Sequence, residues 1–151
     1  MQAMQISIVA AFLVVSAAAQ NHTPASDKER LMGAWHLVSI TGPDGKQVGE
    51  GVPQGMLIYT RDRHMSVQLM YPESANERSD QYVKNGYEAS FGSYDINEAT
   101  HVITHHVQGS VTRGLLVGKD LARIYRLSAD GHLIIRSARA DEHWSVTWEH
   151  Y

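Results

Sequence analysis

The sequence predicts an all-β protein of roughly eight antiparallel strands that close into an up-and-down barrel. Short apolar runs recur along the chain with hairpin-length turns between them. No crossover helices separate these runs, so the strands must pair antiparallel. No strand shows the features that blunt a free sheet edge, and closure into a barrel removes such edges. The 151 residues are enough for one domain.

Each predicted strand is a segment rich in β-forming residues or one that alternates between apolar and polar positions. The alternation is clearest in the third segment, where Met65, Val67 and Leu69 share one face. Turn sequences such as Gly42-Pro43-Asp44-Gly45 end the segments. The predicted strands are Trp35–Thr41, Met56–Thr60, His64–Tyr71, Phe91–Ile96, His101–Gln108, Leu121–Leu127, Leu133–Ser137 and Trp144–Glu149.

Two connections are longer than a hairpin turn. Residues 73–89 are polar and place Tyr82, Val83 and Tyr87 near helical spacing, which predicts a short helical insertion. The segment from Gly109 to Lys119 contains glycines and is expected to be a longer loop.

The N-terminus has the features of an export signal. Ile6 to Ala19 is almost wholly apolar but spans only roughly 20 Å as a helix, less than the roughly 30 Å membrane core. Ala17-Ala18-Ala19 fits a signal-peptidase site, although no Lys or Arg precedes Lys28. We therefore expect a signal peptide over 1–19, a flexible leader over 20–30 and a barrel domain over 31–151. The alternative is a buried N-terminal helix.

This division predicts a secreted or periplasmic protein without an integral membrane segment after cleavage. The chain carries 13 Lys and Arg against 16 Asp and Glu, a net charge of -3, which argues against nucleic acid as a partner. The absence of Cys excludes disulfides, thiol nucleophiles and cysteine-bound metals.

Nine His residues are the unusual feature of the composition. His101 and His105 share a face of one predicted strand, but about 13 Å separates them, too far to bind one ion. We expect no metal site and no cofactor.

The strand from Leu121 places a charged side chain inside the predicted barrel. Leu121, Arg123, Tyr125 and Leu127 share one face, so inward leucines carry Arg123 and Tyr125 inward. A buried Arg requires a partner. That partner is either an internal Asp or Glu or an anionic ligand, for which Arg123 and Tyr125 together could hold a carboxylate.

The adjacent residues His105 and His106 must point to opposite faces, so one of them lies inside. We favour His105 as the inner residue. An internal His can act as a general base or can simply be hydrogen-bonded within the core.

Further motifs follow in order along the chain. Gly33-Ala34-Trp35 is similar to the Gly-x-Trp signature of lipocalins. The other motifs are Leu31–Ser39, Gly55–Thr60, Met65–Leu69, Phe91-Gly92-Ser93-Tyr94, Val102–Ser110, Arg123-Ile124-Tyr125 and Trp148-Glu149. Together they resemble the microbial lipocalin-like domain family, which implies a calycin-type β-barrel with a central pocket. The family has an Arg where this chain has His150.

Two functional hypotheses follow. The first is a carrier of a small, largely apolar and possibly anionic ligand, held by Arg123 and Tyr125. The remaining candidate ligand-binding residues are Trp35, Tyr59, Met65, Leu69, Tyr94 and Trp144. The second is a cofactor-independent isomerase or cyclase, in which His105 is the general base and Arg123 with Tyr125 stabilises an enolate or oxyanion.

Overall fold

The computed structural model describes residues 25–48, 53–72 and 79–151. The predicted signal peptide and residues 20–24 of the predicted leader lie outside the described residues. None of the helices in these three ranges is long and apolar enough to cross a membrane.

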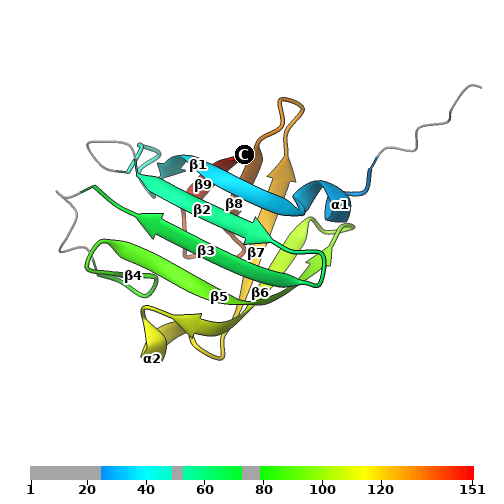
Figure 1. Ribbon diagram of the computed structural model, residues 1–151. Helices are drawn as coiled ribbons and strands as arrows, with labels where there is room; N and C mark the ends of the chain where they lie inside the picture. The colour runs from blue at the N-terminus through cyan, green and yellow to red at the C-terminus, as the bar shows by residue number, and fades with distance from the viewer. Residues whose placement is uncertain (1–24, 49–52, 73–78) are drawn as a thin grey trace, which may run out of the picture.

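Eleven elements make up the described chain (Figure 1). They are α1 (Asp27–Leu31), β1 (Gly33–Thr41), β2 (Gln54–Tyr59), β3 (His64–Met70), β4 (Val83–Lys84), β5 (Tyr87–Asn97), β6 (Val102–Ser110), α2 (Arg113–Leu116), β7 (Asp120–Leu127), β8 (Leu133–Ser137) and β9 (Ser145–His150).

The strands form one antiparallel sheet that closes on itself. The order is β3-β2-β1-β9-β8-β7-β6-β5-β4, and an additional pairing joins β3 to β5. The closing pair runs from His64 opposite Ser93 to Met70 opposite Tyr87. The prediction of an eight-stranded up-and-down barrel is confirmed, with the two-residue β4 added at the start of β5.

The wall bends sharply between β5 and β6, where the register shifts between Phe91 and Gly92. A Cβ atom on Gly92 would collide with the backbone carbonyl of His106. Glycine at this position therefore lets the two backbones approach at the bulge, a usual device for curving a closed sheet.

The predicted helical insertion is wrong over 79–89, and residues 73–78 lie outside the described residues. Asn85 and Gly86 both have left-handed backbones, with φ of 52° and 77°, and form the tight turn of a hairpin between β4 and β5. The Asp80 carboxylate accepts the backbone N–H groups of Tyr82 and Val83. Local turn chemistry thus outweighs the helical spacing of a short polar segment. The expected loop 109–119 contains the single-turn α2.

One end of the barrel is closed by α1, which packs beside the start of β1 (Figure 1). Ser26 and Glu29 form a capping box that fixes the start of this helix. Leu31 is fully buried, and its carbonyl accepts the indole N–H of Trp35 at 3.0 Å. Residues 27–30, which the sequence assigns to the leader, therefore belong to the element that covers the barrel end.

The Gly33-Ala34-Trp35 motif has a direct structural role at this end. The ring of His150 stacks on Trp35 with centroids 3.5 Å apart. Gly33 has φ of 132°, and a Cβ atom there would lie 2.9 Å from Cε1 of His150. Gly33 thus leaves room for His150, which covers the ring of Trp35. The family that the sequence resembles has an Arg at the position of His150.

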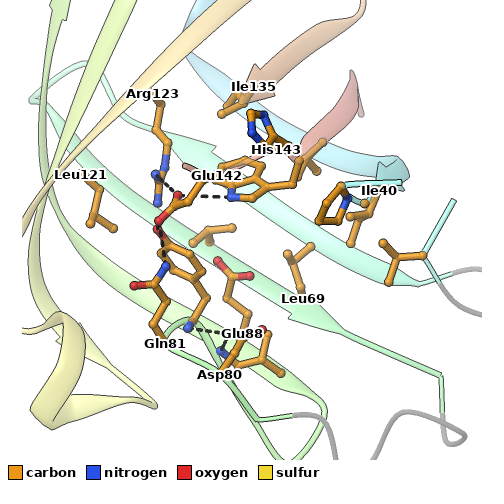
Figure 2. Close-up of a pocket in the computed structure, with 18 of the residues that line it drawn as sticks. Ile40, Leu69, Asp80, Gln81, Glu88, Leu121, Arg123, Ile135, Glu142 and His143 are labelled. Atoms are coloured by element: carbon orange, nitrogen blue, oxygen red, sulfur yellow. Dashed lines mark hydrogen bonds and ion pairs between the residues drawn. The ribbon is translucent and has the colours of Figure 1, made fainter. Parts of the chain in front are cut away.

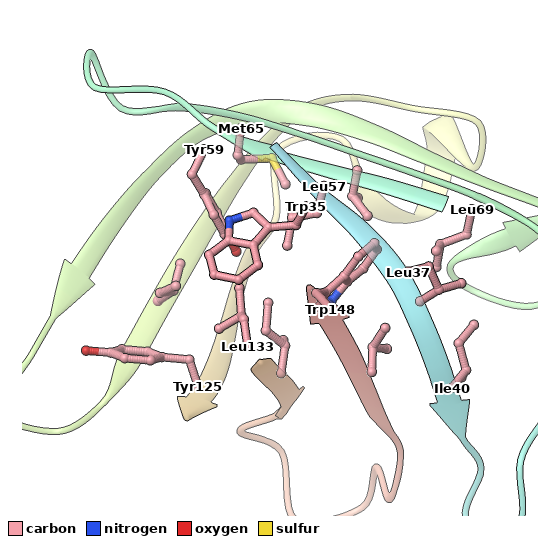
Figure 3. Close-up of a cluster of buried hydrophobic side chains, with 14 of the residues drawn as sticks. Trp35, Leu37, Ile40, Leu57, Tyr59, Met65, Leu69, Tyr125, Leu133 and Trp148 are labelled. Carbon is pink, nitrogen blue, oxygen red and sulfur yellow. The ribbon is translucent and has the colours of Figure 1, made fainter. Parts of the chain in front are cut away.

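The core fills the closed end of the barrel. Figure 3 shows Trp35, Tyr59 and Met65 packed together there, with Leu69 and Ile40 toward the opposite end. The largest fully buried side chains are Trp35, Tyr59, Tyr125, Leu31, Leu57, Ile103, Leu133 and Val83.

We predict that Gly33→Ala lowers the free energy of unfolding by about 2 kcal/mol or more, because it combines backbone strain with displacement of His150. Gly118→Ala is the control. It also has a positive φ, of 82°, but has open space around its Cβ position, and should cost about 1 kcal/mol. Urea denaturation of both variants measures the difference. Equal losses would show that the contact with His150 contributes nothing.

Candidate functional site

The open half of the barrel holds a cavity of about 660 Å³. This volume lies within the range of small-molecule sites. Its walls are mainly apolar side chains that alternate inward from the strands. The apolar lining residues include Ile40, Leu57, Val67, Leu69, Leu116, Leu121, Ile135, Val146 and Trp148.

Arg123 is the charged side chain from the β7 wall of this cavity, and only 6% of it is exposed. Its guanidinium lies 5.2 Å from the ring centre of Tyr82 and 4.9 Å from that of Trp144. Nη1 lies 4.0 Å from Oε2 of Glu142. These two aromatic contacts and the ion pair compensate a charge that would otherwise be costly to bury.

Glu142, from the loop between β8 and β9, is the internal carboxylate that faces Arg123 (Figure 2). It accepts hydrogen bonds from Gln81 Nε2 at 2.7 Å, from the Tyr82 hydroxyl at 3.0 Å and from Trp144 Nε1 at 3.3 Å. Burial alone would raise the pKa of Glu142, but hydrogen bonds from Ser137, Tyr82 and Gln81, with the charge of Arg123, hold it below its usual value. The carboxylate is therefore ionised.

His105 also lines the cavity and is buried, whereas His106 lies on the outer wall. The Tyr59 hydroxyl lies 2.7 Å from Nε2 of His105. The hydroxyl has no other acceptor among the described residues, so it donates to Nε2 and the ring proton lies on Nδ1. Burial and the nearby Arg123 lower the pKa of His105 to about 3. This imidazole is neutral.

Outside the barrel, His106 bridges two carboxylates. Its Nδ1 lies 2.7 Å from Asp120, and its Nε2 lies 3.0 Å from Asp95. Hydrogen bonds to both carboxylates raise the pKa of His106.

The predicted clamp of Arg123 and Tyr125 does not form. Two residues span about 6.6 Å along a strand, which carries Tyr125 from the cavity into the closed end. Its hydroxyl donates to Oδ2 of Asp27 at 3.0 Å. Burial and this carboxylate raise the pKa of Tyr125, so the phenol stays protonated.

The other predicted site residues divide between the two ends of the barrel. Leu69 and Trp144 line the cavity together with Arg123 and His105. Tyr94 donates its hydroxyl to the carbonyl of Thr60 at 2.9 Å. The residues that do not line the cavity are Trp35, Tyr59, Met65, Tyr94 and Tyr125.

The residues that surround Arg123 in the cavity were for the most part not predicted, and Gln81, Tyr82 and Glu142 are the main examples. Tyr82 falls in the segment where the sequence predicts a helix. Glu142 falls in a short connection with no periodic pattern, so no local signal could have placed it beside Arg123. Within the described part of the chain, no group of three or more His, Asp or Glu side chains is arranged to hold a metal ion.

Comparisons with known proteins agree with this architecture. Residues 32–150 match the lipocalin-like domain, and the chain belongs to this family. A lipocalin-like protein from Bacteroides uniformis superposes with a TM-score of 0.51 at 13% identity, over 81% of this chain and 99% of that one. A redesigned β barrel superposes with a TM-score of 0.50 at 12% identity, over 85% and 98%. These likenesses show the fold. The sequence has no match among curated proteins.

The depressed pKa of His105 predicts acid sensitivity. Its folded-state pKa of about 3 lies below the unfolded value of 6.5, so its contribution to stability is complete above pH 6.5 and is lost as pH falls toward 3. Between pH 6 and 5 most carboxylates stay ionised, and His106 is protonated in both states. The free energy of unfolding should fall by about 1 kcal/mol over this interval.

His105→Gln can retain the hydrogen bond from Tyr59 but cannot titrate, so its unfolding free energy should change little between pH 6 and 5. His106→Gln is the control and should retain the wild-type slope. Urea denaturation at both pH values measures these changes. A His105→Gln protein with the wild-type slope would contradict the assignment.

Proposed function

We propose that the protein is an exported carrier that binds one small, largely apolar molecule in the open half of its barrel. The observation that carries this proposal is a cavity of about 660 Å³ with mainly apolar walls, in which Arg123 is the one buried cation among the described residues. A barrel that needed only a packed core would not retain such a volume, because protein interiors pack closely. Membership in the lipocalin-like domain family is consistent with a binding role.

Arg123 supplies the polar anchor of the proposed site. Among the described residues, no carboxylate or carbonyl oxygen accepts a hydrogen bond from its guanidinium, and the nearest carboxylate oxygen is 4.0 Å away. The group therefore retains N–H donors for a ligand. Leu69 and Trp144 contribute apolar contacts to the same cavity.

The isomerase hypothesis is less well supported by the geometry. His105 has its Nε2 bonded to Tyr59 and a pKa of about 3, which makes it a weak base at neutral pH. Tyr125 lies at the closed end with Asp27 and does not reach the cavity. The three groups that the reaction needs are therefore not brought together.

The export part of the proposal rests on the apolar segment Ile6–Ala19 and on Ala17-Ala18-Ala19. Intact-mass measurement of the protein expressed in a secretion-competent host tests it. A mature chain that begins at Gln20 outside the cytoplasm supports export. A full-length cytoplasmic chain would contradict it.

Filling the cavity should abolish binding. Leu121 lines the cavity and is partly exposed, so Leu121→Trp can place its ring in the empty volume with little disturbance of the core. The neighbouring Ala122 is exposed, and Ala122→Trp is the matched control on the same strand. Titration with the neutral fluorophore N-phenyl-1-naphthylamine measures binding.

We expect Leu121→Trp to weaken fluorophore binding at least tenfold and Ala122→Trp to leave it unchanged. Equal affinities in the two variants would place the fluorophore outside the cavity. If the wild-type protein binds neither the fluorophore nor a panel of lipids and other apolar molecules, the carrier proposal is wrong.

A further inference from the structure

The positive charge of Arg123 is already paired with a carboxylate of the cavity wall. Its partner Glu142 is also buried, with 9% of its side chain exposed. Any anionic group that approached the guanidinium would also approach the ionised carboxylate of Glu142. In a poorly solvated site this repulsion offsets much of the attraction to Arg123.

An incoming anion could avoid this repulsion only by displacing Glu142. The carboxylate is held by donors from separate segments: Gln81 and Tyr82 before β4, and Arg139 and Trp144 in or next to its own loop. Displacement would break these contacts together, including those from the half-buried Tyr82 and Trp144, and would leave the buried Arg123 without its carboxylate, which is costly. Glu142 is therefore a fixed part of the wall.

Arg123, in contrast, has donors to spare. A guanidinium carries five N–H groups. Its partners are one carboxylate oxygen at 4.0 Å and the faces of two aromatic rings, so most of these N–H groups stay available to a ligand. A ligand oxygen could accept hydrogen bonds here without bringing a second negative charge into the wall.

We infer that the ligand presents a neutral hydrogen-bond acceptor to Arg123, such as the oxygen of a ketone, an ester or an amide, and that free carboxylates and phosphates are rejected. This inference deepens the proposed carrier function and rests on it. Glu142 is the residue that determines this selectivity, because its charge occupies the position that an anionic head group would need.

Two molecules of the same size and chain length test the inference. Dodecanamide and dodecanoate differ only in their head group, and at pH 8 the first is neutral and the second is ionised. Both compete with bound N-phenyl-1-naphthylamine, and 2-tridecanone is added as an acceptor without N–H groups. We expect the amide and the ketone to bind the wild-type protein at least tenfold more tightly than dodecanoate.

Glu142→Gln removes the opposing charge and keeps the side-chain shape. We expect it to raise the affinity for dodecanoate relative to that for dodecanamide at least tenfold. Glu149→Gln, on the outer wall beside His36, removes the same charge from the molecule and is the control. It should leave both affinities unchanged.

The possible outcomes separate this inference from the carrier proposal. If the wild-type protein binds dodecanoate as tightly as dodecanamide, the neutral-acceptor inference is overturned and the carrier function stands. If the wild-type protein does not bind the fluorophore at all, the carrier function itself fails. The wild-type comparison decides the matter even if Glu142→Gln does not fold.

Discussion

The pairing of β3 with β5 is the constraint on which the rest of the structure depends. It turns an open sheet, with β3 at its edge, into a closed wall. Once the wall is closed, every second side chain of its strands faces one shared interior. The bulge at Gly92 supplies local curvature beside this closing pair. Both the tightly packed core and the cavity are consequences of closure.

The interior is divided because the rings of Trp35, Tyr59 and Tyr125 fill one end. Trp35 packs under Leu31 and His150 there, and Gly33 leaves room for that arrangement. The opposite end is lined mainly by apolar side chains that leave a cavity between them. Arg123 lies in that half, where its burial depends on Glu142 and two rings from loops outside the strands. Loops at the open end therefore complete the polar wall of the site.

The strands and their inward faces were predictable because they depend on local patterns. Alternation over His64–Tyr71 and over the strand from Leu121 has a period of two wherever the strand lies in the sheet. The prediction of a helix over 79–89 was wrong because a few apolar residues in a short polar stretch fit helical spacing by chance. The left-handed turn at Asn85 and Gly86 decides its structure.

The amino-acid sequence alone predicts the run of strands, the Gly-x-Trp motif and the inward position of Arg123, because each depends on residues that are neighbours along the chain. The contacts that Arg123 makes depend on the tertiary structure. Glu142 lies 19 positions away along the chain, and Gln81, which holds Glu142, lies 61 positions from it. The tertiary structure also separated Arg123 from Tyr125, because residues on one face of a strand can lie at different depths of a barrel. Strand periodicity fixes the face of a side chain, and closure fixes its depth and partners.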